Sequence, residues 1–205
     1  QSAVVEPLAG LLGIEPENVC MISENTGGGF GSKGRVYPTM AITGRFAQLL
    51  NRPVQLRITR EEEYYLGVGR PGMQGWVKTG IRSDGTVAAV DVIIISDGGP
   101  TGRNSASSSA QHISVVYTPT AMRLRNIPVF TNTAPRGAQR GPGQNEMSAA
   151  IAPIMDKAAR QLGMDRAQFR RVNAPHSDSP VYESQGPITS AFMAEAIDKA
   201  SDMFN

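Results

Sequence analysis

The sequence predicts an α+β fold, with mixed sheets and packed helices, for three reasons. Residues 73–96 alternate between apolar and polar side chains as the two strands of a hairpin do, and Asp84-Gly85 stands where the turn must lie. The last part of the chain, from about residue 144, has apolar residues at helical spacing. In a parallel βαβ sheet, strands and helices alternate regularly along the chain, and here they do not. The sequence therefore favours a mixed sheet covered by helices.

The N-terminal third is expected to hold two helices and two short strands. Residues 3–12 carry apolar side chains at helical spacing, and Gly13 follows as a stop signal. Residues 19–23 and 54–58 are short apolar runs typical of strands. Residues 38–50, between these runs, are predicted to form a largely buried helix.

Further elements are expected after this third. The hairpin strands are placed at residues 73–82 and 86–96, and residues 122–131 have the pattern of another strand. Residues 98–110 are small and polar and are predicted to form a mobile or extended loop. The final helices are expected at residues 144–162, 166–173 and 189–203, with a spacer at residues 174–187. No linker divides the chain, so residues 1–205 are expected to form one region with a helical C-terminal part at about 144–205.

Composition and charge argue against several classes of protein. The 205 residues include 20 Lys and Arg and 18 Asp and Glu, a net charge of +2 without a long run of one sign, which argues against nucleic-acid binding. The 22 glycines and 14 prolines predict extensive loops. The longest apolar run, residues 92–95, is too short to cross a bilayer, and a signal peptide is not expected. A cytoplasmic location is expected, with the periplasm as the alternative.

The single cysteine, Cys20, limits the redox chemistry of this chain. By itself it can form neither an intrachain disulfide nor an iron–sulfur or cysteine-ligated zinc centre. It lies in an apolar stretch and is expected to be a buried structural thiol. His112 and His176 lack the close spacing of a zinc motif.

A glycine-rich loop at residues 26–33 is nearly free of side chains. Gly29, Gly31 and Gly34 match the GxGxxG pattern of dinucleotide-binding folds, so a nicotinamide-dependent Rossmann enzyme is one interpretation. The hairpin that follows does not suit a Rossmann unit. More generally, glycines let backbone N–H groups approach a ligand closely and donate to anionic oxygens. A flexible surface turn, with Phe30 tucked into the core, is the purely structural alternative.

A second loop, at residues 131–146, carries Arg136 and Arg140 just before a predicted helix. Backbone amides and guanidinium groups near a helix N-terminus form a candidate oxyanion or phosphate site. An ordinary loop with two surface arginines is the alternative.

Four segments occur in the order seen in molybdenum hydroxylases. They are residues 27–31, residues 60–70 from Arg60-Glu-Glu-Glu to Arg70, residues 131–146 and residues 155–173. Together they resemble the molybdopterin-binding large subunit of the xanthine dehydrogenase and aldehyde oxidase family, which includes aerobic carbon monoxide dehydrogenase. Such subunits are several times longer, so the chain is expected to be a fragment or one piece of a split subunit.

The resemblance implies a role for both glycine-rich loops. Phe30 matches the centre of the family's GGGFG loop, whose backbone lies beside an oxygen of the metal centre. Arg140 matches the arginine of the R-G-x-G loop, and the spacing from Thr131-Asn132 favours Arg140 over Arg136. The backbones of Phe30 and Arg140 are thus expected next to the molybdenum ligands. The residues implied in cofactor binding are Gly28, Gly29, Phe30, Gly31, Arg140 and Gly141.

Three positions bear on the substrate. Arg70 aligns with a substrate-orienting arginine of purine-oxidising members, with a salt bridge to Glu61–Glu63 as the structural alternative. Purine oxidisers carry a glutamate where this chain has Gly34, and an aromatic residue where it has Pro142. The resemblance therefore argues against xanthine as the substrate. It also argues against carbon monoxide, whose oxidation uses a copper-binding cysteine in an active-site loop.

The expected function is part of a molybdenum-dependent hydroxylase or dehydrogenase that acts on an aldehyde or N-heterocycle, with water as the oxygen source. A pocket emptied at Gly34 and Pro142 would also suit hydration or dehydrogenation of a cyclic ketone or steroid-like substrate. A non-catalytic module that only binds partner subunits is a third possibility.

The resemblance also implies what this chain lacks. The catalytic base is a glutamate near the C-terminal end of the large subunit, outside this sequence, so no catalytic residue is expected here and the isolated chain should be inactive. The implied cofactor is molybdopterin with molybdenum, in its cytosine dinucleotide form. The implied partners are the rest of the molybdenum subunit, an iron–sulfur subunit with [2Fe–2S] clusters and a subunit with FAD. A small-molecule substrate completes the expectation.

Overall fold

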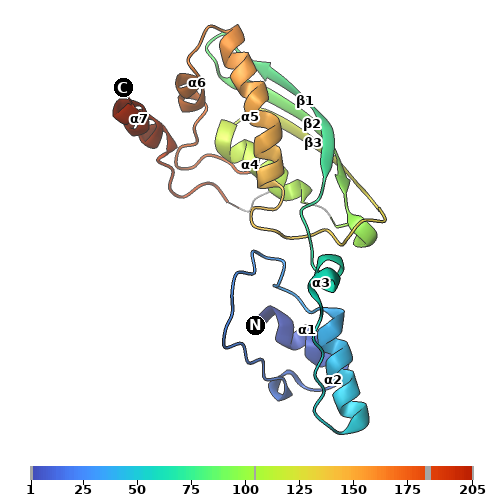
Figure 1. Cartoon of the computed structure of the whole chain (residues 1–205). Coiled ribbons are helices and arrows are strands. Elements are labelled where there is room, and N and C mark those ends of the chain that lie inside the picture. The colour runs from blue at the N-terminus through green and yellow to red at the C-terminus, as the bar shows by residue number, and fades with distance from the viewer. Residues whose placement is uncertain (1, 104, 183–185, 205) are drawn as a thin grey trace.

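The chain folds into an α+β structure in two connected parts (Figure 1). The computed structural model describes residues 2–103, 105–182 and 186–204. The first part contains α1 (Ser2–Leu12), η1 (Pro16–Asn18), α2 (Pro38–Leu50) and α3 (Arg60–Leu66). The second contains β1 (Met73–Ile81), β2 (Val87–Asp97), η2 (Gly99–Thr101), α4 (Ala106–Tyr117), β3 (Ala121–Val129), α5 (Gln144–Gln161), α6 (Arg166–Val172) and α7 (Met193–Phe204).

The sheet is mixed, as the sequence predicts. Its strand order is β1-β2-β3, with β1 antiparallel and β3 parallel to β2. The predicted hairpin turn is confirmed: Asp84 accepts the N–H of Thr86, and Gly85 takes a left-handed φ of +88°. Helix α4 forms the connection that lets β3 run parallel to β2.

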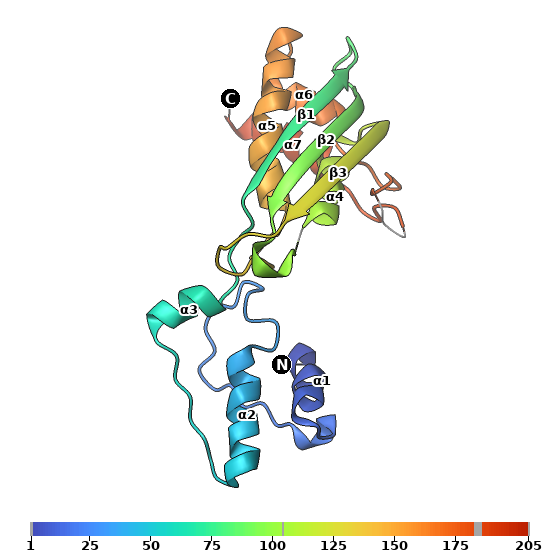
Figure 2. The same ribbon diagram turned by 90° about the vertical axis from the view of Figure 1, so that its right-hand side faces the viewer.

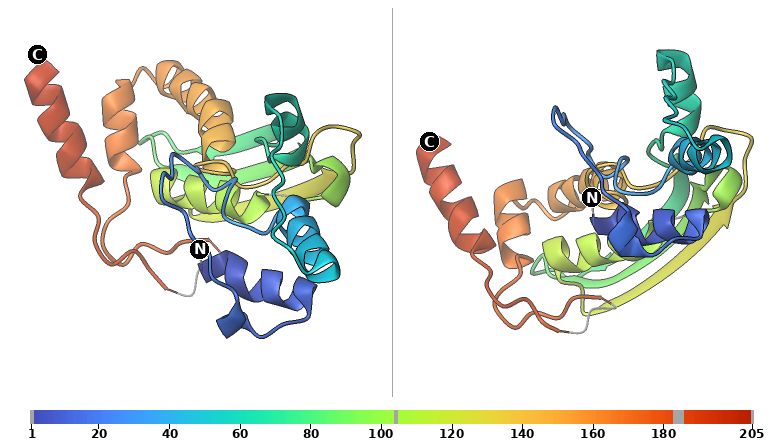
Figure 3. Two further views of the ribbon diagram at one scale, coloured as in Figure 1. Left: turned by 60° about the horizontal axis from the view of Figure 1, so that its bottom comes forward. Right: turned by 90° about the horizontal axis from the view of Figure 1, so that it is seen from below.

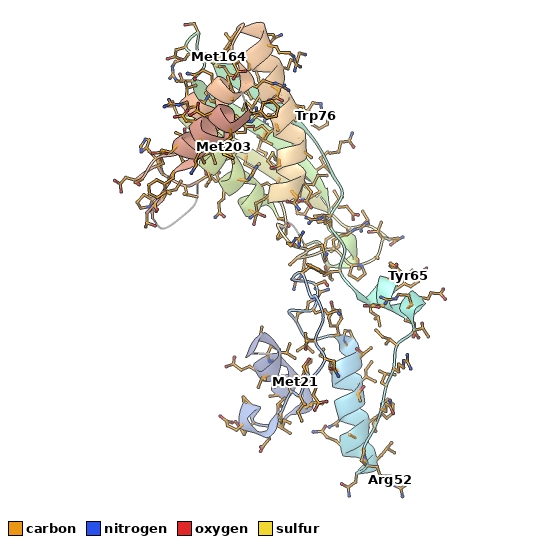
Figure 4. All side chains as sticks on the ribbon, turned by 60° about the vertical axis from the view of Figure 1, so that its left-hand side comes forward. Met21, Arg52, Tyr65, Trp76, Met164 and Met203 are labelled. Atoms are coloured by element: carbon orange, nitrogen blue, oxygen red, sulfur yellow. The ribbon has the colours of Figure 1, made fainter. Side chains whose placement is uncertain are left out.

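The core lies between one face of this sheet and the helices α4 and α5 (Figure 2). Alternate residues of β2 are buried, as expected for a strand with one covered face. The buried core residues are Val87, Val90, Val92, Ile94, Ile113, Tyr117, Met147, Ile151, Met155, Ala159 and Phe169. The opposite face of the sheet carries exposed side chains such as Trp76 (Figure 4).

Asn173 ties three elements of the second part together and is almost fully buried. Its side-chain oxygen accepts the N–H of Val87 at 2.8 Å, and its amide nitrogen donates to the carbonyls of Gly85 and Phe169 at 2.9 and 2.8 Å. Thr118, at the end of α4, donates to the Asn173 carbonyl at 3.0 Å. One side chain thereby joins the hairpin to the C-terminus of α6.

The C-terminal helices follow one another away from the sheet (Figure 3). Helix α6 packs on α5, and α7 packs on α6. The predicted helices are confirmed, although α7 begins at Met193, later than expected. Residues 183–185 of the predicted spacer lie outside the described residues. No described helix is both long and apolar enough to cross a membrane.

In the first part, α1 packs against α2, and both helices lie where the sequence places them. The expectation that residues 38–50 are largely buried is wrong, since α2 has no buried residue. The helix that packs against α2 is the short α1, and apolar side chains of α2, including Phe46 and Leu49, remain exposed. Tyr65 on α3 also projects from the surface (Figure 4).

Two predicted strands are absent from the described structure. Residues 19–23 and 54–58 run as irregular chain, because neither has a strand partner to complete its hydrogen bonds. Cys20 lies on the first of these segments and is exposed, so the expectation of a buried thiol is wrong.

The predicted loop at residues 98–110 is also wrong over much of its length. It contains η2 and the first residues of α4. Small side chains let this helix pack closely against its neighbours, and Ser109 and Ala110 are fully buried. The small, polar composition that suggested a loop serves close helix packing instead.

Candidate functional site

Three irregular segments meet between the two parts of the chain, and we call them together the loop junction: residues 27–34, 67–72 and 131–143. The N–H of Gly69 donates to the carbonyl of Pro135 at 3.0 Å, and the N–H of Gly137 donates to that of Gly69 at 3.1 Å. The N–H of Arg140 donates to the carbonyl of Phe30 at 2.6 Å. The structure thus brings together the two glycine-rich loops that the sequence singled out.

The contact between these loops requires an unusual backbone. Phe30 has a left-handed φ of +50°, which is uncommon for a residue other than glycine, and Gly31 follows with a φ of +98°. A Cβ on Gly31 would lie 3.3 Å from the Cβ of Ala138. The loops therefore approach closely because residue 31 has no side chain.

Side chains also meet above this contact. The Arg140 guanidinium carbon lies 5.4 Å from the centre of the Phe30 ring, within the range of a cation–π interaction. The Phe30 ring is about half exposed. Among the described residues, the Arg140 guanidinium forms no ion pair. The alternative that Phe30 is tucked into the core is wrong.

Several backbone N–H groups of the glycine loop have no hydrogen-bond acceptor among the described residues. The N–H groups of Ser32 and Gly34 close a turn on the carbonyls of Gly29 and Gly31. In the described part of the chain, the N–H groups of Gly28, Gly29, Phe30 and Gly31 donate to no protein acceptor. Successive free amides of this kind bind anionic oxygens.

Arg136 has a different role from Arg140. Its Nε donates to Asp97 at the end of β2 over 2.7 Å. Hydrogen bonds from Thr131, Gly99 and Arg136 lower the pKa of the Asp97 carboxyl to about 2. Arg136 thus anchors the loop to the sheet, which leaves Arg140 as the arginine free to face a ligand.

Arg70 reaches the same loop from the segment between α3 and β1. Its Nη2 donates to the carbonyl of Arg140, and its Nη1 lies 3.4 Å from the carbonyl oxygen of Gly141. Nη1 also lies 3.6 Å from Oε1 of Glu146. The alternative of a salt bridge to Glu61–Glu63 is not what the structure shows: Arg60 is the partner of Glu63.

Glu146 is a site residue that the sequence reasoning missed. Its Oε2 accepts the N–H of Gly143 at 2.9 Å, at the start of α5. A glutamate three residues after the N-cap residue, here Gly143, is the signature of this cap, so the signal was present in the sequence.

Gly34 and Pro142 do not line one cavity. Pro142 lines a cavity of about 300 Å³ together with Pro71, Arg103, Ser105, Ser108, Gly137 and Ala138. Gly34 is exposed at the end of the glycine-loop turn and does not line that cavity. The expectation of a single pocket emptied at both positions therefore has no support within the described residues.

The donor set of the junction defines its chemistry. Among the described residues, no group of three or more His, Cys, Asp and Glu side chains could hold a metal ion. The junction instead offers backbone N–H groups and a guanidinium, which bind anionic oxygens. The Rossmann alternative fails, because no strand precedes the glycine loop in the described structure.

These features agree with the comparison with known proteins. Residues 1–174 match the family described as the molybdopterin cofactor-binding domain, and the chain belongs to that family. More particularly, the relatives it matches are named as xanthine dehydrogenase subunits and aldehyde oxidases, and it corresponds to a part of each of them.

Two relatives and one solved structure illustrate the similarity. The chain is 31% identical to a probable xanthine dehydrogenase subunit of Bacillus subtilis, over 90% of this chain and 25% of the relative. It is 31% identical to an indole-3-acetaldehyde oxidase of Arabidopsis thaliana, over 83% of this chain and 13% of the relative. The aldehyde oxidoreductase of Desulfovibrio gigas superposes with a TM-score of 0.86 at 26% identity, covering 98% of this chain and 22% of that one. The chain thus spans a quarter or less of these relatives.

Proposed function

We propose that this chain forms one wall of the molybdenum-cofactor site in a hydroxylase or dehydrogenase that oxidises an aldehyde or an N-heterocycle, with water as the oxygen source. The observation that carries the proposal is the hydrogen bond from Arg140 N–H to the Phe30 carbonyl. It unites two glycine-rich loops into one surface of backbone donors. Membership of the cofactor-binding family supports the assignment of that surface to the cofactor.

The residues present fit such a cofactor. The N–H groups of Gly28–Gly31 have no protein acceptor in the described part of the chain, and Arg140 adds a positive charge without an ion pair. A Cβ at Gly28 would lie 2.6 Å from the Phe30 ring, so residue 28 has no room for a side chain. A bare, donor-rich and positively charged surface suits a group that carries oxo and phosphate oxygens.

The proposed roles follow from these positions. When bound, the molybdenum cofactor supplies the two-electron oxidation of the substrate carbon, which amino-acid side chains do not perform. The amides of Gly28–Gly31 and Gly141 bind and orient its oxygens. The Phe30 ring and the Arg140 side chain border this surface and would shield a bound group from water. Loss of one such preoriented donor typically costs about 3 kcal/mol of transition-state stabilisation.

The substrate side of the proposal rests on Gly34 and Pro142. Neither residue supplies the carboxylate or the aromatic ring that would hold a purine. We therefore propose an aldehyde or a non-purine heterocycle as the substrate.

The remaining components are proposed from the family. They are the cytosine dinucleotide form of the cofactor, a base glutamate and further cofactor contacts from the rest of the molybdenum subunit, an FAD subunit and a [2Fe–2S] subunit. Cys20 alone cannot hold a cluster, so any cluster of the enzyme lies outside these residues. We propose a cytoplasmic location.

The test is elemental and cofactor analysis of the natively purified complex that contains this chain. Molybdenum and a pterin near one equivalent, with turnover of aldehydes or heterocycles and none of xanthine, would support the proposal. A complex without molybdenum or pterin would instead support the non-catalytic interaction module. Turnover of a cyclic ketone alone would support the hydratase or dehydrogenase alternative.

A further inference from the structure

We propose that Arg70 and Glu146 form a positioning pair that holds residues 140–143 in the shape needed at the loop junction, and that Arg70 does not bind substrate. The inference rests on the proposed function for its consequence in catalysis. Its structural part, the ordering of residues 140–143, can be tested separately.

The first observation is what Arg70 binds. Its Nη2 donates to the Arg140 carbonyl. Its Nη1 donates to the Gly141 carbonyl and lies 3.6 Å from a Glu146 oxygen. Both terminal nitrogens of the guanidinium are therefore directed at the loop. A substrate-orienting arginine would need this planar fork for the substrate carbonyl or ring nitrogen.

The second observation concerns the peptide unit between Arg140 and Gly141. In a trans peptide the C=O and the N–H point in opposite directions. By holding the Arg140 carbonyl, Arg70 turns the Gly141 N–H away from itself. That N–H donates to no acceptor in the described structure, so it is free to serve a ligand. The Asn145 side chain donates to the same Arg140 carbonyl at 3.2 Å and helps to fix the unit.

This loop needs such a constraint because its own residues do not provide one. Gly141 and Gly143 have φ values of +72° and +85° and no side chains to pack. Glu146 restrains the far end through the Gly143 N–H. Arg70 from one side and Glu146 from the other therefore fix both ends of residues 140–143.

The third observation is the dependence of Glu146 on Arg70. The Oε1 atom of Glu146 is buried and accepts no hydrogen bond within the described residues. Arg70 is the cation beside it. Removing Arg70 would leave a buried carboxylate oxygen without a counter-charge, which is unfavourable. Substitutions at the two positions should therefore be non-additive.

The experiment compares variants of the complete enzyme that contains this chain. Arg70→Met removes the guanidinium, Arg70→Lys keeps the charge without the fork, and Glu146→Gln removes the counter-charge. Arg60→Met is the matched control, because Arg60 pairs with Glu63 on the exposed α3 and, within the described residues, forms no hydrogen bond or ion pair with the loop. Hydrogen–deuterium exchange is followed in residues 139–146 and in β2, together with kcat, KM and molybdenum content.

We expect Arg70→Met to speed exchange in residues 139–146 by about tenfold, with β2 unchanged, since charged hydrogen bonds to that loop are lost. We expect kcat to fall by about tenfold, while KM changes by less than about twofold for every substrate tested. Arg70→Lys should recover part of both effects. Glu146→Gln should add less in the Arg70→Met background than alone, and Arg60→Met should match the wild type.

Three results would overturn the inference. One is unchanged exchange in residues 139–146 of Arg70→Met. Another is a rise in KM of more than about twofold for an aldehyde or N-heterocycle substrate, which would assign Arg70 to the substrate. The third applies if Arg70→Met does not fold. Arg70→Lys is then the test, and exchange in its residues 139–146 at the wild-type rate would overturn the inference. A wild-type enzyme without molybdenum would contradict the proposed function instead, and the exchange comparison would still test the pair.

Discussion

The backbone N–H of Arg140 donates a 2.6 Å hydrogen bond to the carbonyl of Phe30, although the two residues lie in opposite parts of the chain. This bond brings the GGGFG loop and the R-G-P-G loop into one surface. The guanidinium of Arg140 over the Phe30 ring reinforces the contact. The junction is therefore the feature on which variants should have the clearest effects.

Gly31→Ala should disrupt the junction, whereas Gly27→Ala should not. A Cβ at Gly31 would meet Ala138 at 3.3 Å, and its φ of +98° is unfavourable for alanine, while a Cβ at Gly27 meets nothing within 4 Å. We expect activity of the complete enzyme to fall by about tenfold or more in Gly31→Ala, consistent with one misplaced donor. Steady-state kinetics at equal molybdenum content measure the effect. Equal loss in both variants would contradict the assignment.

Asn173→Ala should destabilise the part of the chain that contains the sheet. The substitution leaves the Val87 N–H and the Gly85 and Phe169 carbonyls without their partner in a buried setting. We expect the free energy of unfolding to fall by about 2–4 kcal/mol. Chemical denaturation measures it, with the exposed Asn132→Ala as control. A fall no greater than that of the control would show that these bonds contribute little.

Asp97→Asn should weaken the anchor of the second loop. Hydrogen bonds from Thr131, Gly99 and Arg136 lower the pKa of Asp97 to about 2, from the usual 3.8. Because the folded-state pKa is lowered, the stabilisation is complete above pH 4 and is lost as the pH falls toward 2. At neutral pH we expect a loss of about 2 kcal/mol, typical of hydrogen bonds to a charged group. The variant should also show a shallower decline in stability between pH 4 and 2. If stability declines equally between pH 4 and 2 in the variant and the wild type, the charge of Asp97 does not anchor the loop.

His112 should lower the stability of the fold as the pH falls below about 6.5, a higher range than that of Asp97. Burial lowers the pKa of His112, whose Nε2 lies 2.7 Å from the Ser148 hydroxyl between α4 and α5. The unfolded histidine binds its proton more readily, so stability is complete above about pH 6.5 and declines below it. His112→Gln keeps a polar side chain that does not titrate and should reduce this decline. Melting temperatures between pH 7.5 and 5.5 provide the check. Identical slopes for both proteins would contradict the prediction.

The isolated chain should show no oxidase, dehydrogenase or hydratase activity, even with molybdenum cofactor supplied. The carboxylates of Asp97 and Glu146 reach the junction, where Asp97 pairs with Arg136 and Glu146 caps the Gly143 N–H beside Arg70, so both have structural roles there. Turnover assays on the purified 205-residue chain test this expectation. Activity under these conditions would refute the need for a base from elsewhere.

Much of the fold could be predicted from local pattern. The hairpin with its Asp84-Gly85 turn and the helix α5 depend on spacing and turn chemistry, which neighbouring residues determine. Predictions failed where the outcome depends on distant partners. Residues 19–23 have a strand pattern but no strand to pair with, and the small side chains near Ser109 allow a buried helix.

The candidate site divides in the same way. By itself, the sequence determined which loops lack side chains and which residues resemble the molybdenum hydroxylase motifs. Only the tertiary structure decided that Arg136 anchors to Asp97, that Arg140 meets Phe30, and that Arg70 turns toward the second loop. The physical reason is that hydrogen bonds and ion pairs between distant segments depend on how the whole chain packs. Local spacing in the sequence carries no record of which distant carbonyl an arginine will reach.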